Sequence, residues 1–115
     1  MARRERKGLY EGMYILSASL SEDSRKKAFD KITEGILQKG GTIPKTFEMG
    51  RRKMAYEING KREGYYYVVF FEAPTQTIKE LWKEYPLHED LIRYMTMRVE
   101  KVPESLQFKP LKTQG

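Results

Sequence analysis

Apolar residues follow two different spacings along this 115-residue chain, and the changes of spacing divide it into predicted elements. Residues 9–17 are mostly aromatic and aliphatic, which favours a strand. After Ser21, a predicted helix N-cap, apolar residues recur at helical spacing from Ala28 to Leu37. Gly40 then predicts the end of this helix, because glycine readily adopts the left-handed conformation that stops one.

Residues 42–58 are predicted to be extended but irregular. Pro44 favours an edge position and Gly50 favours a bulge or a sharp twist. A turn is expected at residues 59–64, and the most apolar strand of the chain follows at residues 65–71. Together these segments predict a long hairpin with a positively charged tip.

A second helix is expected to begin at Ala73-Pro74-Thr75, where the preceding strand ends. It carries a single apolar stripe at helical spacing, made of Ile78, Leu81, Trp82 and Tyr85. Trp82 is assigned to the core of this helix, and Pro86 is expected to end it. Residues 91–99 predict the last strand.

The predicted order is strand, helix, strand, strand, helix, strand. Right-handed crossovers in both halves convert this order into an α+β ferredoxin-like sandwich, a four-stranded antiparallel sheet with two helices on one face. We expect this domain to occupy residues 9–99. A basic N-terminal extension (1–8) precedes it, and an extended C-terminal tail (100–115) follows it.

The strand at residues 65–71 is apolar on both of its faces, although two helices can cover only one face of such a sheet. The face without helices is expected to present Tyr66, Val68, Phe70, Met95 and Met97. A partner protein or stacked bases would cover these side chains. A homodimer, or the chain's own tail folded over the sheet, is the alternative.

Lysine and arginine total 22 and aspartate and glutamate 16, which leaves a net charge of +6. Two clusters carry much of this charge, one at residues 3–7 and one at Arg51-Arg52-Lys53. Basic side chains gathered in this way neutralise phosphates, so the charge favours a nucleic-acid partner. For the first cluster, a terminus that merely aids solubility is the competing interpretation.

Cysteine is absent and histidine occurs once, at His88. Disulfides, cysteine metal sites and cysteine nucleophiles are therefore excluded, and a catalytic triad would depend on His88 alone. No apolar run approaches the roughly 20 residues of a membrane span, and the charged N-terminus is not followed by the apolar core of a signal peptide. We expect an intracellular protein with no catalytic residue, no metal, no cofactor, no membrane contact and no small-molecule substrate.

Residues 64–70 partly match the aromatic motif on the third strand of RNA-recognition domains, which share this order of elements. Glu63 and Tyr66 depart from that motif. A stand-alone domain that binds single-stranded RNA is therefore the alternative hypothesis. Its stacking residues would be Tyr10 or Tyr14 and Tyr65 or Tyr67. Acylphosphatases share the topology as well, but their phosphate-binding loop is absent from residues 17–21, so we expect no enzyme.

The most specific motif lies in the hairpin. Residues 50–58 read Gly-Arg-Arg-Lys-Met-Ala-Tyr-Glu-Ile. This resembles the signature G-R-R-x-L-A-Y-x-I of the family of the sixth protein of the bacterial small ribosomal subunit. Tyr10-Glu11 is similar to the Y-E pair of that family, Glu72-Ala73-Pro74 to its E-A-P junction, and residues 92–98 to its last strand, I-R-x-M-x-M-R. The resemblance extends across residues 9–99.

Two positions of the signature depart from the family pattern. Met54 stands where leucine is usual, and Glu57 stands where proline often occurs. Methionine conserves the volume of leucine, so the fold expectation is unchanged.

The resemblance implies a structural, non-enzymatic protein of the small ribosomal subunit in the cytoplasm. It implies binding to 16S ribosomal RNA in the central domain, together with the eighteenth small-subunit protein as a heterodimer. These two partners agree with the expected open face and with the basic edge.

Arg51 and Arg52 lie beside a glycine in a kinked hairpin, where they could contact RNA phosphate and ribose. Solvated charges that deter strand-to-strand aggregation are the alternative. Arg93 lies in an otherwise apolar strand, so it requires a phosphate, a carboxylate or a route to the sheet margin. The expected RNA-binding residues are Lys7, Arg51, Arg52, Lys53, Arg93 and Arg98.

Overall fold

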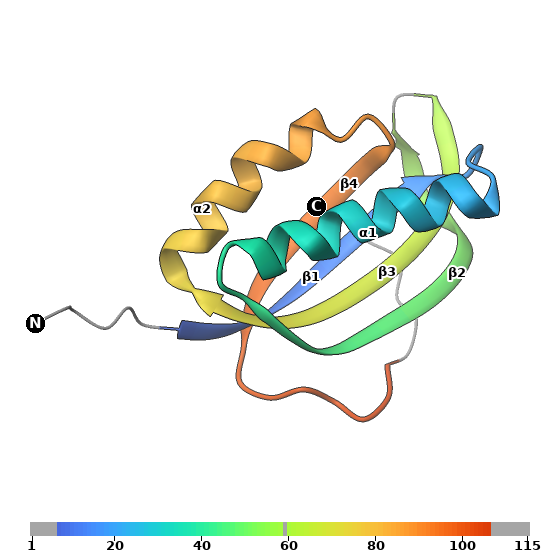
Figure 1. Ribbon diagram of the computed structural model, residues 1–115. Helices are drawn as coiled ribbons and strands as arrows, with labels where there is room; N and C mark the ends of the chain where they lie inside the picture. Colours follow the sequence, from blue (N-terminus) through green and yellow to red (C-terminus); the bar gives the residue numbers. More distant parts are fainter. Residues whose placement is uncertain (1–6, 59, 107–115) are drawn as a thin grey trace, which may run out of the picture.

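The structure is a computed structural model that describes residues 7–58 and 60–106, and it has the predicted order of elements (Figure 1). The elements are β1 (Lys7–Ser17), α1 (Glu22–Gln38), β2 (Thr42–Ile58), β3 (Lys61–Pro74), α2 (Thr75–Glu84), the 3₁₀ turn η1 (Tyr85–Leu87) and β4 (Leu91–Val99). The strands form one antiparallel sheet in the order β2-β3-β1-β4. Both helices cover the same face, which confirms the ferredoxin-like sandwich (Figure 1).

The boundaries of α1 follow from its end residues. Ser21 adopts an extended conformation, and its Oγ accepts a hydrogen bond from the Ser24 amide at 3.1 Å. This is the predicted N-cap, which satisfies one of the amides that a helix start leaves unpaired. Past the other end, Gly40 has a φ of +88°, a conformation that glycine adopts without strain.

The β2–β3 hairpin is longer than the sequence predicts. β3 begins at Lys61, so residues 61–64 of the predicted turn belong to the strand; Asn59 lies outside the described residues. Gly60 has a φ of +78°, which suits a tight hairpin turn. Because Ser17 at the end of β1 pairs with Gly64, the start of β3 extends beyond β1 and pairs with β2 alone.

The predicted irregularity of β2 is confirmed. Gly50 has a φ of +81°, and the pairing with β3 shifts between Glu48 and Gly50. A bulge of this kind bends and twists a strand. It therefore redirects the hairpin end relative to the rest of the sheet.

The main core lies between the sheet and the helices. Tyr14, Val69 and Phe71 are fully buried there, together with Ile36 of α1 and Leu81 of α2. The hydroxyl groups of Tyr14 and Tyr85 are hydrogen-bonded at 2.6 Å within this core. Burial raises the pKa of both phenols, that of Tyr85 to about 12.

Trp82 corrects the sequence prediction, because it is 42% exposed and does not belong to the core. Its indole Nε1 donates a hydrogen bond to Thr96 Oγ1 at 3.1 Å, and its ring packs edge-on against Tyr94. Of the predicted stripe, Leu81 and Tyr85 are buried in the core and Ile78 packs against it. Trp82 is left at the margin of the helix.

The two predicted tails lie mostly outside the described residues. β1 begins at Lys7, so Lys7 and Gly8 belong to the sheet and not to the predicted N-terminal extension. Residues 1–6, which include most of the first basic cluster, are not among the described residues. Of the C-terminal tail, residues 100–106 contain neither helix nor strand, and residues 107–115 lie outside the described part.

Candidate nucleic-acid and partner-protein interfaces

The sheet face that points away from the helices is called the far face below. Its side chains alternate with those of the main core, as the sequence predicts for residues 65–71. The strand register places them in rows across β4, β1 and β3: Arg93, Ile15 and Tyr66; then Met95, Met13 and Val68; then Met97, Glu11 and Phe70.

The centre of the far face is buried, which corrects the expectation of an open surface. Tyr66, Val68 and Phe70 are 1%, 2% and 1% exposed. Part of this burial comes from β2, because the Phe47 ring packs edge-on against Phe70 with their centroids 6.0 Å apart. Exposure increases towards β4, where Met97 is 48% exposed. Contact between these residues and a partner protein stays a prediction.

The end of the β2–β3 hairpin reaches across the far face. The guanidinium of Arg93 on β4 donates a hydrogen bond from Nη1 to the Tyr56 hydroxyl on β2, and it lies 5.6 Å from the centre of the Tyr56 ring. β2 and β4 are the two edge strands of the sheet, so this contact connects its opposite edges. The sequence predicts a phosphate, a carboxylate or the sheet margin for Arg93. The structure supplies a tyrosine of the same chain.

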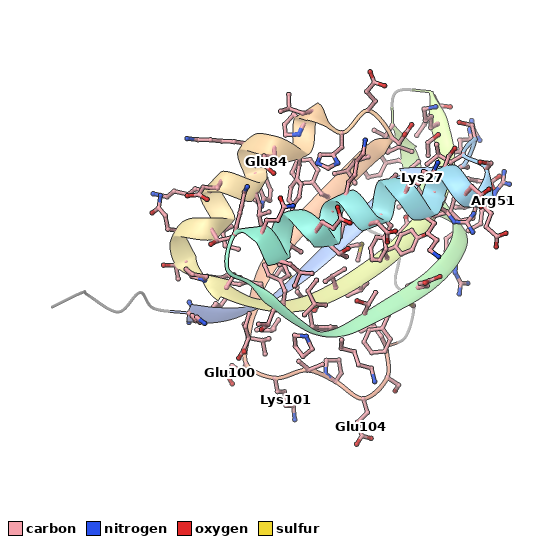
Figure 2. All side chains as sticks on the ribbon, in the orientation of Figure 1. Lys27, Arg51, Glu84, Glu100, Lys101 and Glu104 are labelled. Atoms are coloured by element: carbon pink, nitrogen blue, oxygen red, sulfur yellow. The ribbon has the colours of Figure 1, made fainter. Side chains whose placement is uncertain are left out.

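Three of the predicted RNA-binding residues lie together near the hairpin end. Arg51 Nε forms an ion pair with Glu63 Oε1 at 2.7 Å, and this hydrogen bond and charge raise the pKa of Arg51. Arg52 Nε donates to the carbonyl oxygen of Met49 at 2.9 Å, and Lys53 is exposed. Figure 2 shows Arg51 at the end of the molecule where α1 begins.

The remaining two basic candidates lie at the opposite end of β1. Lys7 pairs with Pro74, and Arg98 pairs with Tyr10. The Arg98 guanidinium lies 5.7 Å from the centre of the Tyr10 ring, on the helix side of the sheet. The predicted RNA-binding residues are therefore divided between two ends of the molecule, and Arg93 stands on the far face nearer the hairpin end. Whether any of them contacts RNA stays a prediction.

A groove at the hairpin end adds residues that the sequence analysis left out of the RNA-binding set. It has a volume of about 380 Å³ and lies between the loop after β1 and the hairpin. Its polar lining includes Ser17, Ser19, Arg51, Lys61 and Arg62. The positive charge of the predicted turn was the sequence feature that could have added Lys61 and Arg62 to this set. Only the shorter turn observed here shows that Lys61 and Arg62 continue β3 beside Arg51.

The tyrosines proposed for base stacking lie on the wrong face for that role. Tyr10, Tyr14 and Tyr67 are 7%, 0% and 5% exposed and belong to the main core under the helices. Tyr65 is half-buried, with the Arg25 guanidinium 3.9 Å from its ring centre. The stand-alone stacking domain, in the form that uses these four residues, is therefore contradicted.

A cleft of about 640 Å³ lies between α1 and the connection from α2 to β4. Its charges are mixed, with Lys27 and Lys31 facing Glu84, Glu89 and Asp90, so it shows no preference for phosphate. Lys27 and Glu84 are labelled in Figure 2. Within residues 7–58 and 60–106, no three metal-ligating side chains gather in one place. No helix in these ranges has the length and apolar character needed to cross a membrane.

Comparison with known proteins identifies the family. The family model for ribosomal protein S6 matches residues 9–98. The small ribosomal subunit protein bS6 of Protochlamydia amoebophila is 57% identical over 106 residues, which cover 92% of this chain and 93% of that protein. The bS6 protein of Chlamydia pneumoniae is 50% identical over 111 residues, covering 96% and 98%.

A solved structure agrees with these relatives. The crystal structure of 30S ribosomal protein S6 from Thermotoga maritima matches with a TM-score of 0.77 and 33% sequence identity, over 82% of this chain and 89% of that one. Relatives of this kind are structural proteins of the cytoplasmic ribosome and not enzymes, as the sequence analysis expected. The motifs in β1, the hairpin and β4, the sandwich fold and these matches lead to one conclusion: the chain belongs to the S6 family of small-subunit ribosomal proteins.

Proposed function

We propose that this chain binds 16S ribosomal RNA in the central domain of the small subunit, together with the eighteenth small-subunit protein. The observation that carries the proposal is the division of its surface into two kinds. Basic side chains gather at the hairpin end around Arg51, whereas the β4 side of the far face presents apolar methionines, Met95 half-buried and Met97 exposed. Two different partners are needed for two such surfaces.

The hairpin end is the proposed RNA contact. Arg52 and Lys53 are exposed beside Arg51, and Lys61 and Arg62 line the adjacent groove. Glu63 and Glu57 form ion pairs with Arg51 and Arg62. These exposed pairs are weak in water, so a phosphate can replace the carboxylate at little cost. Arginine suits this exchange because its planar guanidinium can bind two phosphate oxygens.

The far face is the proposed contact with the eighteenth protein. Met95 and Met97 form its accessible side, and Tyr66, Val68 and Phe70 form its buried floor. Methionine side chains adapt to an uneven partner surface. A protein seated there would cover the exposed part of Met97 and leave the hairpin end available to RNA.

The test is a titration of the purified chain with a central-domain ribosomal RNA fragment at two salt concentrations, with and without the eighteenth protein. We expect tight binding only when the partner is present. The affinity should fall as salt rises, with a slope of about 0.9 per phosphate neutralised on duplex RNA, taken from the value for duplex DNA. Equally tight binding of the lone chain to unrelated single strands would contradict the proposal.

A pair of matched variants locates the RNA contact. Arg51→Ala with Arg52→Ala should weaken RNA binding and reduce the salt slope by about one for each phosphate that is no longer neutralised. The control is Lys79→Ala with Lys83→Ala, which removes the same charge from exposed positions on α2. If both double variants change the slope equally, the effect is one of net charge and the hairpin end does not bind the RNA.

A further inference from the structure

Glu11 is an anomaly on the far face. In its row it lies between Phe70 on β3 and Met97 on β4, and its neighbours along the face are Leu9 and Met13. These four side chains are apolar. Glu11 is half-buried among them, and desolvation by this burial raises the pKa of its carboxyl group.

No cation of the described chain compensates this carboxylate. Within residues 7–58 and 60–106, no ion pair or side-chain hydrogen bond joins Glu11 to another residue. Of the other charged groups on the far face, Lys7 is exposed at the start of β1, two rows from Glu11. Arg93 contacts Tyr56, the Lys45 amine lies 5.3 Å from the centre of the Phe47 ring, and Glu72 lies one row away with the same sign of charge. A half-buried charge without a partner costs stability, so the isolated chain gains nothing from it.

We infer that Glu11 is the docking point for a lysine or arginine of the partner protein, whose aliphatic stem lies along Met13, Met95 and Met97. This inference rests on the proposed function, because it takes the eighteenth protein as the occupant of the far face. Long cationic side chains bury their methylene groups on apolar surface while the charged end reaches a polar partner. The row of methionines beside a carboxylate fits that shape and that charge.

The sign of the charge decides between a protein and RNA at this position. A carboxylate repels phosphate, so RNA is excluded from the immediate surroundings of Glu11. The basic hairpin end has the opposite preference. Charge complementarity therefore assigns the Glu11 side of the far face to a cationic protein segment and fixes how that segment is placed.

The test uses the full chain, the eighteenth protein and the central-domain RNA fragment, with the variant Glu11→Gln. Glutamine keeps the shape and removes the charge. We expect Glu11→Gln to weaken assembly with the eighteenth protein by at least about tenfold, because the partner's cation then loses its counter-ion. The matched control is Glu72→Gln, an exposed carboxylate on the same face, which should leave assembly unchanged.

Two further measurements separate this role from a structural one. The isolated Glu11→Gln chain should melt at the same or a higher temperature than the parent at neutral pH, because the substitution removes an uncompensated charge. Lowering the pH through the titration range of Glu11 should weaken assembly of the parent and have less effect on Glu11→Gln. A merely structural glutamate would show neither pattern.

Each outcome decides a different claim. If the parent assembles and Glu11→Gln assembles equally well, the inference is wrong and the proposed function stands. If the parent does not assemble with the eighteenth protein at all, the proposed function fails and the inference fails with it. If Glu11→Gln lowers the melting temperature of the isolated chain, this chain already supplies the cation. If Glu11→Gln self-associates less than the parent, a second copy supplies it. Either result overturns the inference.

Discussion

Both faces of the sheet bury aromatic side chains, but they treat polar groups differently. On the helix face, the buried hydroxyls of Tyr14 and Tyr85 satisfy each other at 2.6 Å. On the far face, Glu11 is half-buried without a counter-ion among the described residues. A satisfied polar pair rigidifies a core, whereas an uncompensated, half-buried charge costs stability. Both faces supply buried side chains that stabilise the fold, whereas the proposed recognition of a partner falls to the far face.

The largest effect is expected from the helix face. Phe71→Ala should lower the free energy of unfolding by about 3–5 kcal/mol, because it leaves a cavity at a fully buried position. Urea denaturation measures the change. Leu87→Ala is the control, since Leu87 is 78% exposed and its loss should cost no more than about 0.5 kcal/mol.

Phe70→Ala is the counterpart on the far face and sharpens the comparison. Phe70 is 1% exposed, so its truncation should cost nearly as much as that of Phe71. A cost below about 1 kcal/mol would show that the centre of the far face opens in solution, since truncations in closed cores cost several times more. Similar burial on the two faces would then be contradicted.

Gly64→Ala tests how tightly the far face is packed beside the hairpin. An added Cβ would lie 2.4 Å from Ile15 Cγ2 and 2.9 Å from the carbonyl oxygen of Leu16, so we expect a loss of about 1–3 kcal/mol in the free energy of unfolding. Gly35→Ala is the matched control. There the added Cβ approaches no atom closer than 3.7 Å, and alanine in a helix should instead stabilise by up to about 1 kcal/mol. Thermal or urea unfolding measures whether stability falls for Gly64→Ala and rises for Gly35→Ala.

Tyr14→Phe tests the satisfied polar pair. Removing one hydroxyl leaves that of Tyr85 buried without its partner, which should cost about 1–3 kcal/mol of unfolding free energy. Tyr14→Phe with Tyr85→Phe removes both hydroxyls and should cost less than twice the single change. A strictly additive double variant would contradict the coupling.

The same pair gives stability a dependence on alkaline pH. The pKa of Tyr85 is raised from 10.0 to about 12 in the folded chain, so between these values the unfolded chain loses the phenolic proton first. Stability from this group is complete below pH 10 and falls as the pH rises towards 12. Urea unfolding across this range should show a shallower decline for Tyr85→Phe than for the parent. Equal slopes would contradict burial as the cause.

The smallest effect on stability is expected at the hairpin end. Glu63→Gln breaks the ion pair with Arg51, which is exposed to water. We expect no measurable change in the urea midpoint and a slight gain in RNA affinity, because Arg51 is then available to phosphate. A large loss of stability would show that the pair holds the hairpin together.

The order of elements could be predicted because the signals are local. Ser21, the apolar spacing of α1 and the glycine after it act within a few residues, and so does the alternation of β3. The contact between the two edges of the far face could not be predicted, because it depends on where the hairpin end lies in the fold. The contact of Tyr56 with Arg93 joins residues 37 positions apart in the sequence, and no local pattern encodes it.

The basic cluster at the hairpin end could be predicted from residue type, but its extent could not. The motif at residues 50–58 placed Arg51 to Lys53 in the hairpin, whereas Lys61 and Arg62 were assigned to a turn and instead belong to β3 and line the groove with Arg51. The prediction for Trp82 was wrong. Its spacing fits the apolar stripe of α2, but spacing alone does not tell which member of the stripe lies at the margin: Tyr85 is 2% exposed and Trp82 is 42% exposed.

The length of β2 has a consequence for the chain before it meets any partner. Its 17 residues form one edge of the sheet, and an edge of that length offers unpaired backbone groups to other strands. Pro44 removes one donor, the bulge at Gly50 breaks the flatness, and Arg51 to Lys53 add repulsion between copies. Newly made chains that wait for assembly thus carry built-in resistance to amyloid-like association.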